Sequence, residues 1–313
     1  MNKLSELHFL KAGLQSLVQD QGRMGYQAYG VAVGGFLDEG AAKMANWLVG
    51  NELGGPVLEI TLMGPAIAFG EDCQIALTGA NLSPRLNGKA LPMYESLHIP
   101  AGSMLDFGRP LNGCRAYLAV GGKWQLPQWL GSYSAAPQTL AWLTPESVIK
   151  KNSLLRIRTR PPIPPRCIPE KYRPQYGKWQ DIRVLPGPEF GQFSRFAIGH
   201  FFSYTYPISP QSNRMGYRLQ GKIADFHPKE EIISSGSVPG TIQVSNEGQP
   251  IVLLADAQTS GGYSRIANVI SADMPLLAQM KPGDEVHFVP VSLPQAEKAQ
   301  QQMLELQARL LGH

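Results

Sequence analysis

Glycine and proline constrain this chain more than any other feature of its sequence, since they supply 33 and 26 of its 313 residues. Glycine loses much backbone entropy when it is fixed in a helix. Proline removes a backbone donor and clashes with the preceding helical turn. Because both residues break helices, we expect few long helices in this protein.

The balance of charged and apolar residues indicates a folded protein. Apolar residues make up 43% of the chain and charged residues 17%, which is enough apolar surface to form a core. The 28 basic and 24 acidic side chains give a net charge of +4, and the basic ones are scattered rather than gathered in a stripe. A stripe is what a phosphate backbone requires. We therefore expect no nucleic acid among the partners.

The spacing of the cysteines and histidines and the distribution of apolar residues bear on metal binding and on the cellular compartment. Cys73, Cys114 and Cys167 form no CxxC pair, which argues against a disulfide framework or a zinc site. The six histidines are far apart in sequence. Residues 1–21 contain no apolar signal segment, and no run approaches the roughly 18 apolar residues of a membrane span. These features favour a cytoplasmic protein without a metal or a membrane anchor.

Short runs rich in β-branched and aromatic residues, bounded by Gly, Pro or Asn, predict strands along the whole chain. The fold class predicted is therefore mostly β. The runs are residues 57–62, 73–78, 115–120, 154–159, 182–185, 251–254 and 285–291.

Helical spacing occurs in two or three segments. In residues 38–48, Asp38 can cap a helix whose alanines recur every three or four residues before Gly50 ends it. Ser292 and Gln295 have the spacing of a capping box, which predicts a C-terminal helix. A third, short helix is predicted within residues 273–280.

Six prolines between residues 161 and 174 predict the boundary between two domains. Proline cannot pair regularly within a sheet and favours an extended connector. We predict an N-terminal β-rich lobe over residues 1–160, a proline-rich linker over 161–177 and a C-terminal β-rich lobe over 178–313.

Residues 212–221 hold the densest group of polar side chains. If this segment is a strand, Arg214 and Arg218 flank Gly216 on one face, and Tyr217 anchors the other face in the core. Two guanidinium groups beside a residue without a side chain form a notch suited to a carboxylate or a phosphate. A solvated strand face with ion pairs is an equal alternative on this segment alone. Gly216 leads us to favour the notch.

A second polar group follows the predicted strand at 251–254. Its two consecutive glycines permit positive φ, which would let successive backbone N–H groups converge on an anion. A tight turn whose hydroxyl groups satisfy the backbone is an equally good interpretation. The residues of this group are Asp256, Gln258, Thr259, Ser260, Gly261, Gly262 and Tyr263.

Three other patterns have simple interpretations. Residues 216–222 match the first seven positions of a phosphate-binding loop, but Ile223 stands where the Mg²⁺-binding hydroxyl is required. Lys281 lies between Met280 and Pro282, so the Met-Lys-Met acceptor of covalently bound biotin is absent. Asp20 and Arg23, in a polar loop near the N-terminus, are interpreted most simply as a weak surface pair within a turn.

Seven segments in order resemble the allophanate hydrolase subunit 2 family, whose members are similar to biotin-dependent carboxyltransferases. The resemblance covers nearly the whole chain, and seven ordered segments are far more specific than one motif. The segments are residues 18–23, 45–51, 58–62, 115–122, 185–188, 213–219 and 256–263.

The resemblance implies cyclophilin-like barrels and a subunit-1-type partner. In the 5-oxoprolinase branch of the family that partner is the B-type subunit, and a LamB/YcsF-type protein, the A-type subunit, completes an enzyme that uses ATP to open the lactam of 5-oxoproline to glutamate. In the urea amidolyase branch the equivalent regions are fused as a carboxyltransferase that receives CO₂ from carboxybiotin. A chain without fused modules or biotin resembles the first branch more. The alternatives are a non-catalytic regulatory partner of a subunit-1 homologue and an allophanate- or urea-related subunit.

Opening an unstrained amide through phosphorylation of its oxygen requires anion-binding groups and a proton donor. We interpret Arg214, Gln258 and Tyr263 as catalytic candidates, and the ATP involved is bound here or in a partner. Family members usually continue Gly131-Ser132-x-Ser134 with Thr-Asp and a Gly-Gly-x-x-Gly-Arg turn, but this chain has Ala135 and Ala136 and lacks those glycines. Candidates for substrate or nucleotide binding are Asn213, Arg218, Thr259, Ser260, Gly261, Gly262, Asp20 and Arg23.

Overall fold

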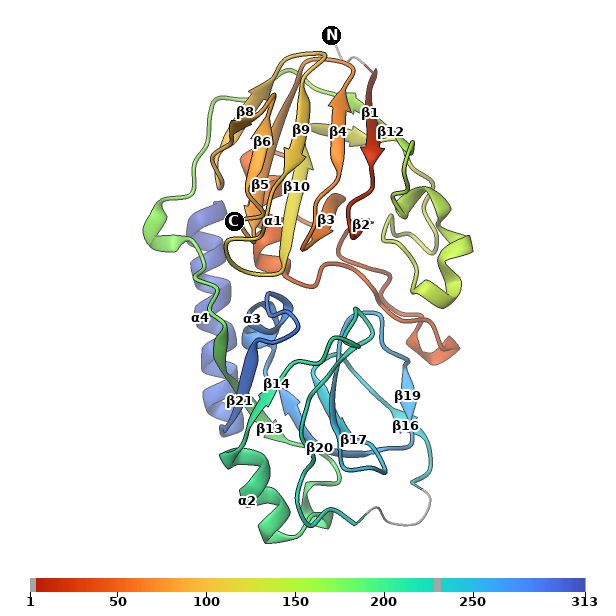
Figure 1. Cartoon of the computed structure of the whole chain (residues 1–313), viewed down its shortest axis with the longest axis vertical. Coiled ribbons are helices and arrows are strands. Elements are labelled where there is room, and N and C mark those ends of the chain that lie inside the picture. The colour runs from red at the N-terminus through yellow and green to blue at the C-terminus, as the bar shows by residue number, and fades with distance from the viewer. Residues whose placement is uncertain (1–3, 228–231, 313) are drawn as a thin grey trace. The chain divides into compact units, whose positions relative to one another are not determined.

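The computed structural model describes residues 4–227 and 232–312, and contacts divide the chain into two compact units (Figure 1). The first unit comprises residues 1–23 and 34–176, and the second comprises residues 24–33 and 177–313. Strands dominate both units, so the prediction of a mostly β protein with two β-rich lobes is confirmed. All seven predicted strands are present.

Two antiparallel sheets form the first unit. The strands of the five-stranded sheet are, in spatial order, β2 (Gln15–Gln19), β3 (Val57–Thr61), β10 (Arg115–Val120), β5 (Cys73–Gly79) and β8 (Ser96–Ile99). Those of the seven-stranded sheet are β11 (Gly122–Trp124), β12 (Leu154–Thr159), β1 (Leu4–Lys11), β4 (Ala66–Phe69), β9 (Met104–Phe107), β6 (Pro84–Leu86) and β7 (Lys89–Ala90).

The three central strands of the five-stranded sheet, β3, β10 and β5, are buried on both faces. One face packs against the seven-stranded sheet in a core that contains Ile60 and Leu118 from the first sheet and Phe9 and Ile67 from the second. The helix α1 (Glu39–Leu48) covers the other face, where Thr78 Oγ1 donates to the carbonyl of Ala41 at 2.7 Å. Burial on both faces explains why β3, β5 and β10 are so apolar in sequence.

The proline-rich segment is packed onto the first unit, so its predicted role as a linker is wrong for residues 161–176. The side-chain amide of Gln74 forms hydrogen bonds of 3.1 Å with both the N–H and the carbonyl of Ile163. The N–H of Arg166 donates to Ser96 Oγ at 2.9 Å, and Ile168 is buried. Proline prevents these residues from joining a sheet, but side chains of neighbouring strands satisfy their backbone instead.

The second unit contains one curled seven-stranded sheet and one small sheet. The small sheet pairs β16 (Ser235–Gly236) with β19 (Ser260–Gly261). The large sheet has the order β14 (Thr205–Pro207), β21 (Glu285–Pro290), β13 (Trp179–Pro186), β20 (Ser264–Val269), β17 (Thr241–Val244), β18 (Pro250–Leu253) and β15 (Gly216–Arg218).

Among its described residues, the second unit has three α-helices. The C-terminal helix α4 (Leu293–Leu311) and the short α3 (Met274–Ala278) were predicted, and the N–H of Ser292 donates to Gln295 Oε1 at 2.8 Å as a capping box requires. The helix α2 (Arg195–Ser203) was not predicted. It packs against β21, and the rings of Phe201 and Phe288 stack at 4.9 Å between centroids.

Candidate functional site

Each unit holds its own cluster of buried charged side chains, and the cluster of the first unit is centred on Asp20. This carboxylate lies directly after β2 and is 5% exposed. Its Oδ1 accepts hydrogen bonds from Ser132 Oγ and Ser134 Oγ, both at 2.6 Å, and from the N–H of Gly22 at 2.8 Å. Its Oδ2 accepts from the N–H of Tyr133 at 2.7 Å. Asp20 therefore ties the loop at 131–134 to the end of β2.

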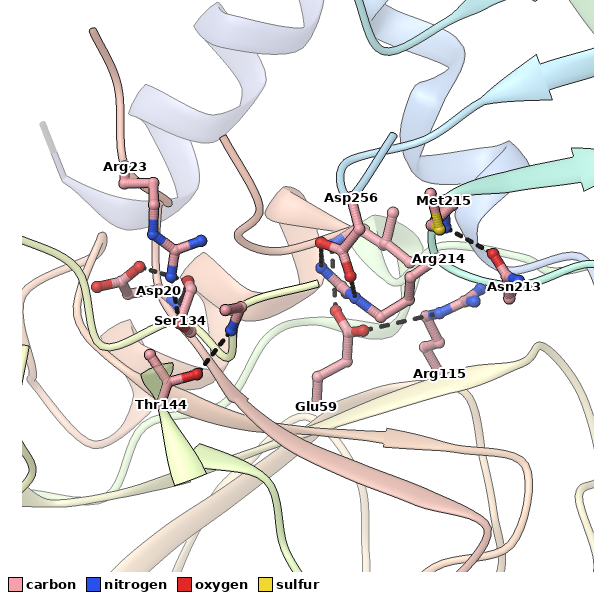
Figure 2. Close-up of polar contacts among 12 residues, drawn as sticks. Asp20, Arg23, Glu59, Arg115, Ser134, Thr144, Asn213, Arg214, Met215 and Asp256 are labelled. Atoms are coloured by element: carbon pink, nitrogen blue, oxygen red, sulfur yellow. Dashed lines mark hydrogen bonds and ion pairs between the residues drawn. The ribbon is translucent and has the colours of Figure 1, made fainter. Parts of the chain in front are cut away.

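Arg23 extends this cluster. Its side chain is 1% exposed, donates to the carbonyl of Ser134 and places its guanidinium 4.8 Å from the centroid of the Trp129 ring. Figure 2 shows Asp20 and Arg23 both close to Ser134. The interpretation of the two residues as a weak surface pair is wrong, because both are buried and both are held by the loop that follows Gly131.

That loop carries the divergence found in the sequence. The N–H of Ala135 donates to the carbonyl of Val18 at 2.9 Å, and the N–H of Ala136 donates to Thr144 Oγ1 at 2.8 Å (Figure 2). Although the usual glycines are missing, the start of the loop is firmly anchored. The chain then enters a short 3₁₀ segment at Gln138–Leu143.

A hydrogen-bonded series of ionisable groups lies on the face of the five-stranded sheet under α1. The hydroxyl of Tyr117 donates to Glu59 Oε2 at 2.9 Å and accepts from the N–H of Asp38 at 2.7 Å. The carboxylate of Asp38 accepts from the N–H of Ala41 at 2.9 Å, which confirms it as the helix cap, and from the hydroxyl of Tyr176 at 3.1 Å. Burial, reinforced by the nearby carboxylates, raises the pKa of Tyr117 well above its usual value.

Arg115 joins the same face, with its Nε 3.8 Å from Glu59 Oε1 (Figure 2). The sequence prediction did not assign a role to Glu59, Arg115 or Tyr117. A signal was present, since Glu59 is a charged residue among the apolar residues Val57, Leu58 and Ile60 of a strand that is buried along its whole length. Buried ionisable groups are costly unless they are paired, so such an interruption indicates a network.

A pocket of about 630 Å³ opens beside Asp20 within the first unit. Three of the segments that carry the family resemblance, residues 18–23, 45–51 and 115–122, contribute to its lining, as does the divergent loop through Tyr133. Its polar lining includes Asp20, Asn51, Lys123, Tyr133, Arg158 and Arg160.

Arg214 and Asp256 form a buried ion pair in the second unit. Arg214 Nε donates to Asp256 Oδ2 at 2.8 Å and its second nitrogen donates to Oδ1 at 3.0 Å, which makes a bidentate pair (Figure 2). The two residues are 3% and 5% exposed. Such parallel hydrogen bonds fix both side chains in one orientation.

The predicted notch between Arg214 and Arg218 is therefore wrong. The strand β15 begins at Gly216, and Arg214 precedes it in a turn closed by the N–H of Asn213, which donates to the carbonyl of Gly216 at 3.1 Å. The turn directs Arg214 into the protein, whereas Arg218 is exposed. Tyr217 is buried as predicted, and its hydroxyl donates to the carbonyl of Met280 at 2.8 Å.

The glycine pair at 261–262 does not form the predicted anion-binding nest. Neither glycine has a positive φ, and Gly261 lies in β19, opposite Ser235 of β16. A Cβ on Gly261 would lie 2.6 Å from Gln243 Nε2, so the missing side chain serves packing. Gln258 is exposed and Tyr263 is 40% exposed. The carbonyl of Thr259 accepts from the N–H of Ser237 at 2.8 Å.

As predicted, residues 216–222 do not form a phosphate-binding loop. Its first residues form β15 and pair with β18, so the backbone N–H groups take part in a sheet. In a true phosphate-binding loop they surround the phosphate at the start of a helix.

The match to a known family agrees with this architecture. Residues 29–290 match the carboxyltransferase domain, subdomains A and B, and the chain belongs to this family. It is 42% identical to the 5-oxoprolinase C subunit of Escherichia coli over 296 residues, which are 94% of each chain. It is 33% identical to the protein of the same name from Haemophilus influenzae, over 91% of each chain.

A solved structure shows the same fold within a larger enzyme. The urea amidolyase of K. lactis superposes with a TM-score of 0.86 and 27% identity over 97% of this chain. The matched part is 20% of that enzyme. The resemblance inferred from seven sequence segments is thus confirmed at the level of the family.

Proposed function

We propose that this chain is the C-type subunit of a 5-oxoprolinase, an enzyme that hydrolyses ATP while it opens the lactam of 5-oxoproline to glutamate. The observation that carries the proposal is the 42% identity to the C subunit of a 5-oxoprolinase over 94% of both chains. A match of this extent includes both units, whereas the similarity to the K. lactis enzyme concerns only a part of that protein.

The reaction requires activation, because an unstrained amide resists attack by water. Transfer of a phosphoryl group to the lactam oxygen would make the carbonyl carbon electrophilic, and the charge that develops needs preorganised donors. Among the candidate site residues of the second unit, the side chains of Gln258, Tyr263, Arg218 and Asn213 are exposed to solvent. We assign the oxyanion contact to Gln258 and proton transfer to Tyr263. Arg214 is bound to Asp256, so we assign it a positioning role toward the segment at 256–263.

The proposed partners are a subunit-1-type protein, equivalent to the B-type subunit of 5-oxoprolinase, and a LamB/YcsF-type protein, equivalent to its A-type subunit. ATP is proposed to bind in this chain or in a partner, and residues 216–222 are excluded as its site because their first residues form a strand. Covalent biotin has no part in the proposal. Among the residues that the structure describes, no helix combines the length and apolar content needed to cross a membrane.

Reconstitution tests this function. The chain and its two proposed partners are purified separately, and glutamate formation from 5-oxoproline is measured with and without ATP for each combination. We expect turnover only when all three proteins and ATP are present. Substantial turnover by this chain alone would reject the hypothesis that all three proteins are needed for activity. No turnover by the complete mixture would reject the proposed reaction.

The alternative is a carboxyltransferase acting on a urea-related substrate, favoured by the close superposition with urea amidolyase. The same mixtures are supplied with urea, bicarbonate, ATP and a biotin carrier protein. Carboxylation of urea without glutamate formation from 5-oxoproline would favour this alternative.

A further inference from the structure

The pocket beside Asp20 contains three cations on one wall. Lys123 of β11 lies directly opposite Arg158 of β12 in the antiparallel register, so both side chains belong to the same face of the sheet. Arg160 follows two residues after Arg158 and also lines the pocket. Like charges directly opposite each other destabilise a sheet unless something neutralises them.

No acidic side chain of the described residues pairs with Lys123, Arg158 or Arg160. A neighbour on the same strand shows the contrast, since Arg156 Nε donates to Glu6 Oε1 at 3.0 Å. Arg160 donates from one terminal nitrogen to the carbonyl of Val49. Its buried Nε has no acceptor within the described parts of the chain. Burial and the nearby cation Arg166 lower the pKa of Arg160, so its charge is held at a cost.

Neither of the two acidic side chains that line the pocket forms an ion pair with these three cations. Asp20 already accepts four hydrogen bonds from its own loop and from the loop at 131–134. Glu52 is exposed and forms no ion pair among the described residues. The cationic wall therefore faces the pocket without a counterion from the surrounding side chains.

The wall is also rigidly built. Asn51 Nδ2 donates to the carbonyl of Val120 at 2.9 Å, and its Oδ1 accepts from the N–H of Gly122 at 3.1 Å. Gly122 has a φ of +141°, and a Cβ there would lie 2.3 Å from the carbonyl oxygen of Arg158. Only glycine allows β11 to approach β12 this closely, and the approach sets the separation of Lys123 from Arg158.

We propose that this pocket binds an oxyanion, a carboxylate or a phosphate group, between Lys123, Arg158 and Arg160. The pocket volume of about 630 Å³ leaves room for a larger molecule that carries the anionic group. The proposal stands apart from the lactam chemistry assigned to the second unit. If the proposed function is correct, the carboxylate of 5-oxoproline and the phosphates of ATP are the two sources of such a group.

Isothermal titration calorimetry of the full-length chain tests the pocket. The probes are inorganic phosphate, 5-oxoproline and 2-pyrrolidinone, which is the same lactam without the carboxylate. We expect phosphate or 5-oxoproline to bind and 2-pyrrolidinone not to bind. Arg158→Gln and Lys123→Gln should each weaken the binding about tenfold, since each removes a charge-assisted contact. Arg156→Gln is the matched control, because it removes a cation from the same strand outside the pocket and should leave the affinity unchanged.

The outcomes separate the two sources and the two proposals. Binding of 5-oxoproline that depends on Arg158 identifies the substrate carboxylate, whereas binding of phosphate alone identifies a phosphoryl group. The proposed anion site is rejected if neither anion binds or if Arg158→Gln binds as tightly as the unmodified chain. It is also rejected if Arg156→Gln loses as much affinity as Arg158→Gln. Failure of the reconstituted enzyme to make glutamate would reject the proposed function and leave this binding result intact.

Discussion

Asp20 in the first unit and Asp256 in the second are equally buried, yet the chain stabilises their negative charges in different ways. Asp20 accepts hydrogen bonds from two hydroxyl groups and two backbone N–H groups, and Asp256 is bound in bidentate fashion by Arg214. A carboxylate held by several neutral donors loses one contact when one donor is removed. A carboxylate held by one arginine loses its principal counterion at once.

The largest effect is expected from Arg214→Ala. It leaves Asp256 as a buried charge without this partner, so the free energy of unfolding should fall by about 3–5 kcal/mol. Urea denaturation of the purified chain measures this decrease in the free energy of unfolding. The control is Arg218→Ala, because Arg218 is an exposed residue of β15, the strand that follows Arg214 in the chain. This substitution should change stability by less than about 0.5 kcal/mol. Equal stability of the two variants would show that the pair contributes little.

A double variant sharpens this result. Arg214→Met combined with Asp256→Leu replaces the ion pair by apolar groups and should recover most of the lost stability. Tyr217→Ala removes a buried ring and should also cost about 3–5 kcal/mol. Stability alone therefore does not separate Arg214 from Tyr217, although the predicted alternation placed only Tyr217 in the core.

A smaller effect is expected from Ser132→Ala. It removes one of the four hydrogen bonds to Asp20, and a bond to a charged group contributes about 1.5–3 kcal/mol. The control is Ser147→Ala, because Ser147 Oγ donates to the neutral carbonyl of Tyr133 at 2.7 Å. That variant should lose about 1 kcal/mol. If Ser132→Ala destabilises the chain as much as Arg214→Ala, the contrast between the two carboxylates does not hold.

The smallest effect is expected on the loss of stability in acid and involves Glu189 of the second unit. Its carboxylate is more accessible than those of Asp20 and Asp256. Hydrogen bonds from Arg265, at 2.8 Å and 2.6 Å, hold the pKa of Glu189 below its usual value of 4.5. Because the folded-state pKa is lowered, the stabilisation is present above pH 4.5 and is lost as the pH falls through the lowered pKa. Melting temperatures between pH 6 and pH 3 should fall less steeply for Glu189→Gln than for the unmodified chain. Identical slopes would contradict this role.

The elements that the sequence predicted are those whose signal is local. The seven strands and the helix after Asp38 follow from residue type, spacing and caps within a few positions. The helix α2 was missed because apolar residues occupy most of its length and leave no amphipathic spacing. Its available signal was the cap, since Ser194 Oγ accepts from the N–H of Ala197 at 3.0 Å.

The candidate site depends on contacts that local patterns do not contain. Ser132 and Ser134 meet Asp20 across 112 and 114 positions of sequence. The alternation that placed Arg214 on the face opposite Tyr217 was extended to a position two residues before β15 begins, where the chain forms a turn and Arg214 is buried. Gly261 and Gly262 illustrate a different limit, because glycine permits a positive φ without requiring it. The roles assigned to Gln258 and Tyr263 stay predictions.

The division of the chain into units has a consequence for its synthesis. Domains generally fold in the order in which they leave the ribosome. Here residues 24–33 belong to the second unit but are translated before most of the first. The first unit can complete its fold once Tyr176 has emerged, while this early segment waits for strands that are made last. In a nascent chain paused near residue 176, residues 24–33 would therefore still lack the strands of the second unit.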